Sequence, residues 1–271
     1  MLTVTNVEVA GFRTAIRGMR NPLKSWDKAD STEVIGPKEV SDEQYEKYYR
    51  EFLEKASLEV PNEEFKVNVL NDVKRSVEKS HLPYNEESTL VPCFFLGEND
   101  LDLAQRLIKS GSDHSKFMRQ IYVGMNITAP LYWWKEASTY KVATTANSES
   151  TMHTLMKEPI TLDMFSFDGM APEGEGKDWV CDLITIIHLC ETYRLKYIET
   201  KDKAYWRRLV QILPNGWNQM RTWTANYQTL RNIYFARRNH KLKEWHQFCE
   251  FIETLPYAKE LICYEPEVNN D

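Results

Sequence analysis

The stretch WTANYQTLRNIYFAR, residues 223–237, carries the most informative pattern in the chain. Asn226 and Arg237 are separated so that, at ~100° per residue, they fall within about 20° of one another on a helical wheel. An Asn and an Arg on one helix face can hydrogen-bond the edge of a planar heteroaromatic ring. The same spacing is also typical of a solvated polar face with ordinary ion pairs. We therefore expect a helix over residues 217–239, with either a binding face or a solvated one.

A second polar stretch, TTANSESTMHTL at residues 144–155, precedes an apolar run. Ser150 and His153 are a possible nucleophile and base, but a nucleophilic serine on a strand–turn–helix elbow is flanked by glycines, and this stretch contains none. Two interpretations remain: a helix start capped by Ser and Thr, or the same geometry used to bind a phosphate. We expect a helix N-terminus here and keep both roles open.

The other polar candidates are weaker. His114 lies in GSDHSKF beside Asp113 and Lys116, which is typical of a surface histidine or of the edge of a polar pocket. It has no metal-ligand spacing, so we expect no metal site. The five cysteines include no CxxC pair, which favours reduced core thiols over a disulfide framework or a structural zinc site.

Composition bounds the class of protein. With 271 residues and 42% hydrophobic residues, the chain is long enough for one sizeable core. No run of eighteen apolar residues occurs and the N-terminus lacks a signal pattern, so we expect a cytosolic protein without a membrane span. The net charge of −6 argues against a broad nucleic-acid surface. A cluster of basic residues between 207 and 243 still permits binding of a small anion.

The periodicities predict a mixed, helix-rich α/β fold in a single domain over residues 1–271. We expect Asn99 or Asp100 to cap a helix that ends at Gly111, and Thr128 to cap a helix with Pro130 in its first turn. The expected strands are 3–16, 90–97 and 117–127. The other expected helices are 41–57, 62–80, 178–198, 201–213, 217–239 and 242–262, and 166–178 is expected to be a loop.

Taken in order, these motifs resemble the flavin-dependent thymidylate synthases. Asp113-His114 resembles the family's Glu-His segment, and Thr139-Tyr140-Lys141 lies where the family has Arg-His-Arg. Residues 147–153 resemble Asn-Glu-x-Ser-x-Arg-Tyr with one extra residue, and residues 223–237 match the family's C-terminal motif without a gap. The resemblance covers about 99–155 and 205–250, whereas segments 18–95 and 156–204 differ from the family core.

Several charged positions depart from the family pattern. The Arg-His-Arg segment keeps only its last positive charge, Lys141, and the substrate-binding Arg of Ser-x-Arg is Met152. The loss of that arginine would remove a charge-assisted phosphate contact worth roughly 1.5–3 kcal/mol. Lys141, Arg207 and Arg208 are the cations that we expect to be able to replace it.

The resemblance implies the transfer of a one-carbon unit to C5 of a pyrimidine deoxynucleotide such as dUMP. In this reaction methylenetetrahydrofolate supplies the one-carbon unit and reduced FAD delivers a hydride. NADPH is the implied reductant. A cytosine nucleotide is an alternative substrate. Arg237 would be the catalytic, base-polarising residue. The residues implied for the substrate are Glu136, Ser150, Thr151, Met152 and Arg237. The residues implied for FAD are His114, Thr139, Tyr140, Lys141, Asn226 and Asn232.

The family builds each site from several subunits, so the resemblance also implies a homotetramer. The alternative hypothesis, from a different class, is a catalytically inactive nucleotide-binding or structural homo-oligomer that keeps the fold.

Overall fold

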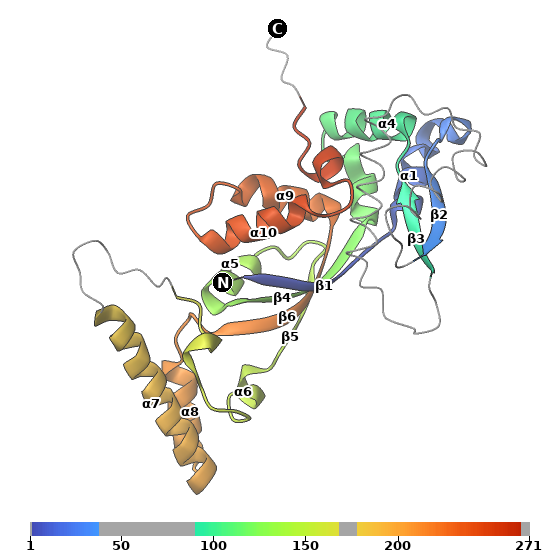
Figure 1. The fold of residues 1–271 in the computed structure, drawn as a ribbon. Helices are drawn as coiled ribbons and strands as arrows, with labels where there is room; N and C mark the ends of the chain where they lie inside the picture. The colour runs from blue at the N-terminus through green and yellow to red at the C-terminus, as the bar shows by residue number, and fades with distance from the viewer. Residues whose placement is uncertain (1, 38–89, 168–177, 267–271) are drawn as a thin grey trace.

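The computed structural model describes residues 2–37, 90–167 and 178–266. The helices expected at 41–57 and 62–80, and most of the loop expected at 166–178, lie outside the described residues. The centre of the fold is a four-stranded antiparallel sheet in the order β1-β4-β6-β5, which crosses the middle of the molecule (Figure 1). Its strands are β1 (Thr3–Ala10), β4 (Tyr122–Pro130), β6 (Asn218–Asn226) and β5 (Thr145–Ser148).

One face of the sheet carries the main hydrophobic core. Along β4 the buried positions alternate, as expected for a strand with one covered face, at Val123, Met125, Ile127 and Ala129. The covering helices are α5 (Leu131–Ala137), α9 (Tyr227–Arg237) and α10 (Lys243–Glu253). Tryptophans dominate the contact, with the rings of Trp133 and Trp245 4.9 Å apart between centroids. Many of the aromatic residues of the sequence therefore lie in this core.

A second layer packs against the end of the core. It contains α1 (Phe12–Met19), α4 (Glu98–Lys109), the 3-10 helix η3 (Ser115–Gln120) and the π-helix η5 (Ala258–Ile262). A separate two-stranded ribbon of β2 (Thr32–Pro37) and β3 (Leu90–Phe95) lies beside it (Figure 1). The strand expected at 90–97 is confirmed, and α4 ends before Gly111, whose φ of 101° suits a glycine.

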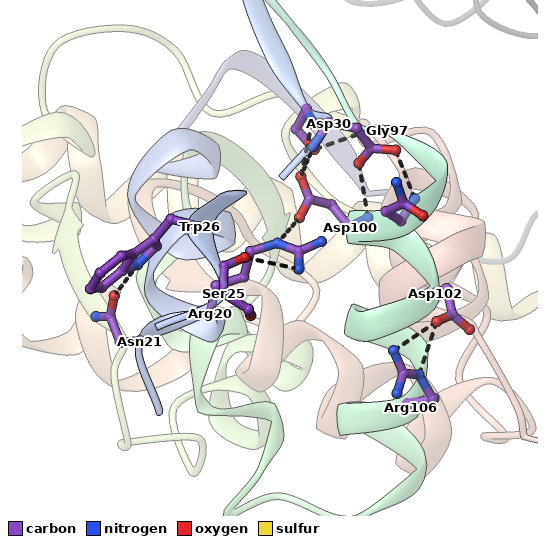
Figure 2. Close-up of polar contacts among 11 residues, drawn as sticks. Arg20, Asn21, Ser25, Trp26, Asp30, Gly97, Asp100, Asp102 and Arg106 are labelled. Atoms are coloured by element: carbon purple, nitrogen blue, oxygen red, sulfur yellow. Dashed lines mark hydrogen bonds and ion pairs between the residues drawn. The ribbon is translucent and has the colours of Figure 1, made fainter. Parts of the chain in front are cut away.

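The start of α4 is capped from a distant part of the chain. Neither Asn99 nor Asp100 is the cap, because the helix begins at Glu98 and the Asp30 carboxylate accepts the Asn99 and Asp100 N–H groups at 2.8 and 3.0 Å (Figure 2). The Asp100 carboxylate in turn accepts from Arg20 and from the Ser31 N–H group (2.9 Å). Arg20 and Asp100 are both buried, so this ion pair ties α1 and α4 together inside the protein.

A helical hairpin lies at the other end of the sheet. It consists of α7 (Asp178–Thr200) and α8 (Lys203–Ile212), which lie side by side far from α1 and α4 (Figure 1). A smaller core joins the hairpin to the sheet through Ile187, Cys190, Leu209 and Trp217. None of the described helices is long and apolar enough to cross a membrane.

Three expected boundaries were wrong. The strand expected at 3–16 ends at Ala10, because Gly11 turns the chain and Phe12, Ala15, Ile16 and Met19 form the buried stripe of a helix. The strand expected at 117–127 is a 3-10 helix up to Gln120, after which β4 continues through Thr128, so Thr128 caps no helix. The helix expected at 242–262 is interrupted after Glu253, next to Pro256, which has no N–H to continue it.

The largest correction concerns residues 217–239. Residues 218–226 are strand β6, paired with β4 on one side and β5 on the other, and only residues 227–237 are helical. Gln219, Trp223 and Ala225 are buried on one face, whereas Met220, Thr222 and Thr224 on the other face are exposed. This alternation is the period of a strand.

Candidate functional site

An arginine–carboxylate cluster lies where α5 meets the end of α9. Arg237 donates from Nη1 to Glu136 Oε2 (2.9 Å) and from Nε to the Tyr140 hydroxyl (2.8 Å). All three residues were assigned to the site from the sequence, although Glu136 is 101 positions away from Arg237. The guanidinium group also lies over the Trp245 ring, 4.8 Å from its centroid. The structure therefore brings the predicted catalytic residue, one predicted substrate residue and one predicted cofactor residue into direct contact.

Two members of this cluster were missed by the sequence analysis. Trp245 Nε1 donates to Glu136 Oε2 (3.0 Å), and His240 Nε2 lies 3.4 Å from the same oxygen. His240 follows the end of α9 and Trp245 lies in the first turn of α10, so neither shares a helix face with Arg237. Their proximity to Glu136 results from tertiary packing and has no local periodicity that could have indicated it.

Asn226 has a different position from the one predicted. It is the last residue of β6 and the N-cap of α9, with its side-chain oxygen accepting the Thr229 N–H group (2.9 Å). The side chain is 3% exposed. The helical-wheel relation to Arg237 was therefore wrong, because Asn226 precedes the helix, and its amide stabilises the start of α9.

His114 and Asn232 are connected through two intervening side chains. His114 is the exposed residue before η3, and the next residue, Ser115, donates to Gln228 Oε1 (2.9 Å). Gln228 then donates to Asn232 Oδ1 (3.2 Å). His114 and Asn232 thus lie on the same side of α9, and both are exposed.

The segment after α5 is a turn held against α9. The Thr139 hydroxyl donates to the Glu136 carbonyl (2.7 Å), and the Thr229 hydroxyl donates to the Val142 carbonyl (3.2 Å). Thr139 and Lys141 are exposed, whereas Tyr140 points inward to Arg237. The three residues that correspond to Arg-His-Arg in the resemblance are therefore split between solvent and the Arg237 cluster.

The stretch that begins at Ser150 contains a single helical turn, α6 (Thr151–Thr154). Ser150 is its N-cap residue by position, as predicted, but its hydroxyl makes no capping hydrogen bond. Gln219 of β6 holds this turn by donating to the Glu149 carbonyl (2.8 Å) and to the Thr151 hydroxyl (3.0 Å). Ser150 and Met152 are exposed. A one-turn helix has only a small dipole, so any anion held here depends mainly on side chains.

The buried thiols are poor nucleophiles. Burial raises the pKa of Cys190 to about 11, of Cys249 to about 12 and of Cys263 to about 11, so these thiols stay protonated near neutral pH. The structure shows Cys181, Cys190, Cys249 and Cys263 as free thiols. In the described part of the chain, no group of three or more His, Cys, Asp or Glu side chains is arranged to hold a metal ion.

The described chain is thus a helix-rich α/β protein built on one antiparallel sheet, with its predicted site residues gathered around α5, α9 and the β5–α6 turn. Comparisons with known protein families and with curated proteins find no match. The fold itself is similar to thymidylate synthase X (ThyX) from Helicobacter pylori, solved with FAD and dUMP. That alignment covers 97% of this chain and 97% of the other, with 14% sequence identity and a TM-score of 0.57.

A second structure, the flavin-dependent thymidylate synthase ThyX from Helicobacter pylori complexed with FAD and dUMP, aligns over 70% of this chain and 92% of that one. It has 16% identity and a TM-score of 0.48. The first alignment shows that the chain has a flavin-dependent thymidylate synthase-like fold, which confirms the fold expected from the sequence.

The residues that the resemblance assigns to FAD fit such a ligand in part. His114, Thr139, Lys141 and Asn232 are exposed polar groups, one of them a cation, and suit an anionic dinucleotide. Asn226 does not fit, because its buried amide already caps α9. Tyr140 differs from these four residues, because it is only partly exposed and its hydroxyl accepts from Arg237.

Proposed function

We propose that this protein is an enzyme that transfers a one-carbon unit to C5 of a pyrimidine deoxynucleotide such as dUMP, with FAD as its cofactor. The observation that carries this proposal is the contact among Glu136, Tyr140 and Arg237. Arg237 is 97 positions from Tyr140 and 101 from Glu136, and the sequence resemblance assigns all three to one site. A fold similar to a ThyX solved with FAD and dUMP supports the same function.

Arg237 is the proposed base-polarising residue. Its Nε and Nη1 groups are fixed by Tyr140 and Glu136, and the Trp245 ring supports the plane of the guanidinium. The remaining N–H groups can donate to the pyrimidine as negative charge develops in its ring. Because these donors are already oriented, little reorganisation is required when substrate binds.

The cofactor surface is proposed to consist of His114, Thr139, Lys141 and Asn232. When bound, reduced FAD supplies the hydride, with methylenetetrahydrofolate as one-carbon donor and NADPH as reductant. Ser150 and Thr151 face the nucleotide phosphate in this proposal, and Met152 supplies no charge there. The exposure of Ser150, Met152 and all four residues of β5 is consistent with sites completed by other subunits of a homotetramer.

A catalytically inactive nucleotide-binding homo-oligomer is the second candidate. The observation that favours it is the Glu136–Arg237 ion pair, because a carboxylate at 2.9 Å offsets the charge with which Arg237 would stabilise a developing anion. This candidate predicts binding of a nucleotide without turnover.

The experiment that separates the two measures NADPH oxidation by the purified, FAD-loaded protein with methylenetetrahydrofolate present, and compares dUMP with dCMP. The proposed enzyme oxidises NADPH in a nucleotide-dependent manner and forms a C5-methylated product. Nucleotide binding without product would support the inactive homo-oligomer. Arg106→Gln, an exposed change on α4, is the matched control and should behave like the wild type.

A further inference from the structure

Arg221 of β6 is a half-buried cation that is not paired with a carboxylate among the described residues. Nε donates to Gln219 Oε1 (3.0 Å) and Nη1 donates to the Ser138 hydroxyl (3.2 Å), both of which are neutral groups. Within the described ranges, no Asp or Glu forms an ion pair with it. Burial lowers the pKa of Arg221, which reflects the cost of holding this charge away from water.

The guanidinium group is held in a fixed orientation. It stacks on Trp134, 4.3 Å from the ring centroid, and Trp134 is itself anchored by a hydrogen bond from Nε1 to the Gln219 carbonyl (2.9 Å). The Gln219 side chain that accepts from Arg221 also donates to the Glu149 carbonyl and the Thr151 hydroxyl. One glutamine therefore orients both the arginine and the turn that contains Ser150.

Two exposed serine hydroxyl groups lie near this arginine. In the β5–β6 ladder Ser148 is directly opposite Arg221, so the two side chains project from the same face of the sheet. Ser138 and Ser148 are both exposed. The carboxylate of neighbouring Glu149 accepts from the Met220 N–H group (3.3 Å), and it is not among the ion-pair partners of Arg221 in the described residues. Arg221 thus has N–H donors left over, next to two hydroxyls that solvent can reach.

Arg231 shows that burial alone does not produce this arrangement. Burial lowers the pKa of Arg231 as well, but its Nη1 donates to the carbonyls of Ile262 (2.7 Å) and Tyr264 (2.6 Å) and fastens the C-terminal segment. The donors of Arg231 are used to hold the fold together. Among the described residues Arg221 has no comparable set of backbone acceptors, and it lies beside the β5–α6 turn, where its remaining donors suit an anionic ligand.

We propose that Arg221, with the Ser138 and Ser148 hydroxyls, binds the phosphate of a nucleoside monophosphate and replaces the arginine that is missing at Met152. This inference rests on the proposed function for the identity of the nucleotide. The positive charge that compensates for the missing arginine is then that of Arg221 in the sheet. Lys141, Arg207 and Arg208, which the sequence suggested for this role, are not needed for it. A guanidinium group offers a phosphate two parallel N–H donors, which an ammonium group cannot.

The test measures how much the phosphate group contributes to binding. Dissociation constants for dUMP and for deoxyuridine are compared by calorimetry on the FAD-loaded protein, for the wild type, Arg221→Gln and the control Arg106→Gln. Arg221→Gln should weaken dUMP roughly tenfold to a hundredfold and leave deoxyuridine nearly unchanged, as expected for loss of one charge-assisted contact. The control should match the wild type for both ligands.

Two further variants keep the test decisive if Arg221→Gln folds poorly. Arg221→Lys keeps the positive charge but loses the pair of parallel N–H donors. It should weaken the binding of dUMP by less than Arg221→Gln does. Met152→Arg in the Arg221→Gln background should restore much of the dUMP affinity, because it returns a cation to the adjoining turn. Equal losses for dUMP and deoxyuridine, or no loss for either, would overturn the assignment of Arg221 to the phosphate.

A third arm uses inorganic phosphate, measured by its effect on thermal unfolding. If the wild type binds neither dUMP nor deoxyuridine but is stabilised by phosphate in an Arg221-dependent manner, the proposed function fails and the Arg221 site stands. If phosphate stabilises the wild type and Arg221→Gln equally, or neither of them, the Arg221 site is refuted whatever the fate of the proposed function.

Discussion

The α1–α4 corner and the β5–β6 edge each hold an arginine at least partly away from water. They differ in whether a carboxylate is paired with the arginine. In the corner, Arg20 is 4% exposed and is paired with Asp100, which is fully buried. Where β6 pairs with the edge strand β5, the acceptors of Arg221 among the described residues are the neutral side chains of Gln219 and Ser138. A buried charge is retained when it is paired or when it serves a ligand. The first arginine therefore serves stability, whereas the second is available for binding.

Arg237 lies between these two extremes. Its partner Glu136 is a carboxylate, as at Arg20, but both side chains are partly exposed, at 20% and 35%. The Glu136–Arg237 pair can orient donors for a neutral pyrimidine ring without attracting a second anion. In the proposed function, the base of the nucleotide therefore lies at Arg237 and its phosphate at Arg221.

The largest effect is expected in the corner. Asp100→Ala leaves the Arg20 guanidinium buried without its counterion and should lower the free energy of unfolding by about 3–5 kcal/mol. Urea denaturation measures the change. Asp102→Ala is the matched control, because it breaks the exposed pair with Arg106 and should cost less than about 1 kcal/mol. Similar costs for the two variants would show that the Arg20 pair does not differ from a surface pair.

The next effect concerns turnover. Arg237→Ala removes the oriented donors of the proposed base site and should lower kcat about 10²–10³-fold, as for loss of an oxyanion-hole donor. The flavin should remain bound, because the proposed FAD residues His114, Thr139, Lys141 and Asn232 are untouched. Steady-state NADPH oxidation and the visible spectrum report the two quantities. An unchanged kcat would exclude Arg237 from catalysis.

A smaller effect, on the affinity for dUMP, is expected when Arg237 loses its carboxylate partner and so has only neutral acceptors, like Arg221. Glu136→Gln keeps an acceptor for Trp245 and Arg237 but removes the negative charge. Anionic dUMP should then bind more tightly by less than about tenfold at low salt, and the gain should fade as salt screens the exposed charge.

Glu265→Gln is the control for this variant, because it frees the exposed Arg238 and should leave dUMP binding unchanged. Weaker dUMP binding in Glu136→Gln at every salt concentration would contradict the idea that Glu136 offsets the charge of Arg237.

The sequence predicted the fold class and most of the helices, because local periodicity and capping residues are visible in the chain. It also placed Arg237 and Glu136 at one site through the resemblance. It misassigned residues 218–226 because polar Gln219 and Arg221 occupy inward-facing positions of β6 and obscure the alternation of a strand. A polar residue in an inward position is difficult to recognise without its partners.

Contacts between segments that are distant in the sequence could not be predicted from local sequence patterns. Asp30 caps α4 from about seventy positions away, and Trp245 reaches Glu136 across the core. Arg221 carries no local signal for a ligand, since its significance comes from the absence of a carboxylate partner among the described residues around it. Such features depend on the whole fold and not on a motif.

The most direct test of the proposed function is the visible absorption spectrum of the purified protein before and after addition of FAD and then dUMP. We expect the wild type to show the absorption band of a bound oxidised flavin, and we expect dUMP to perturb this band. A protein that remains colourless, takes up no added FAD and shows no response to dUMP would contradict it.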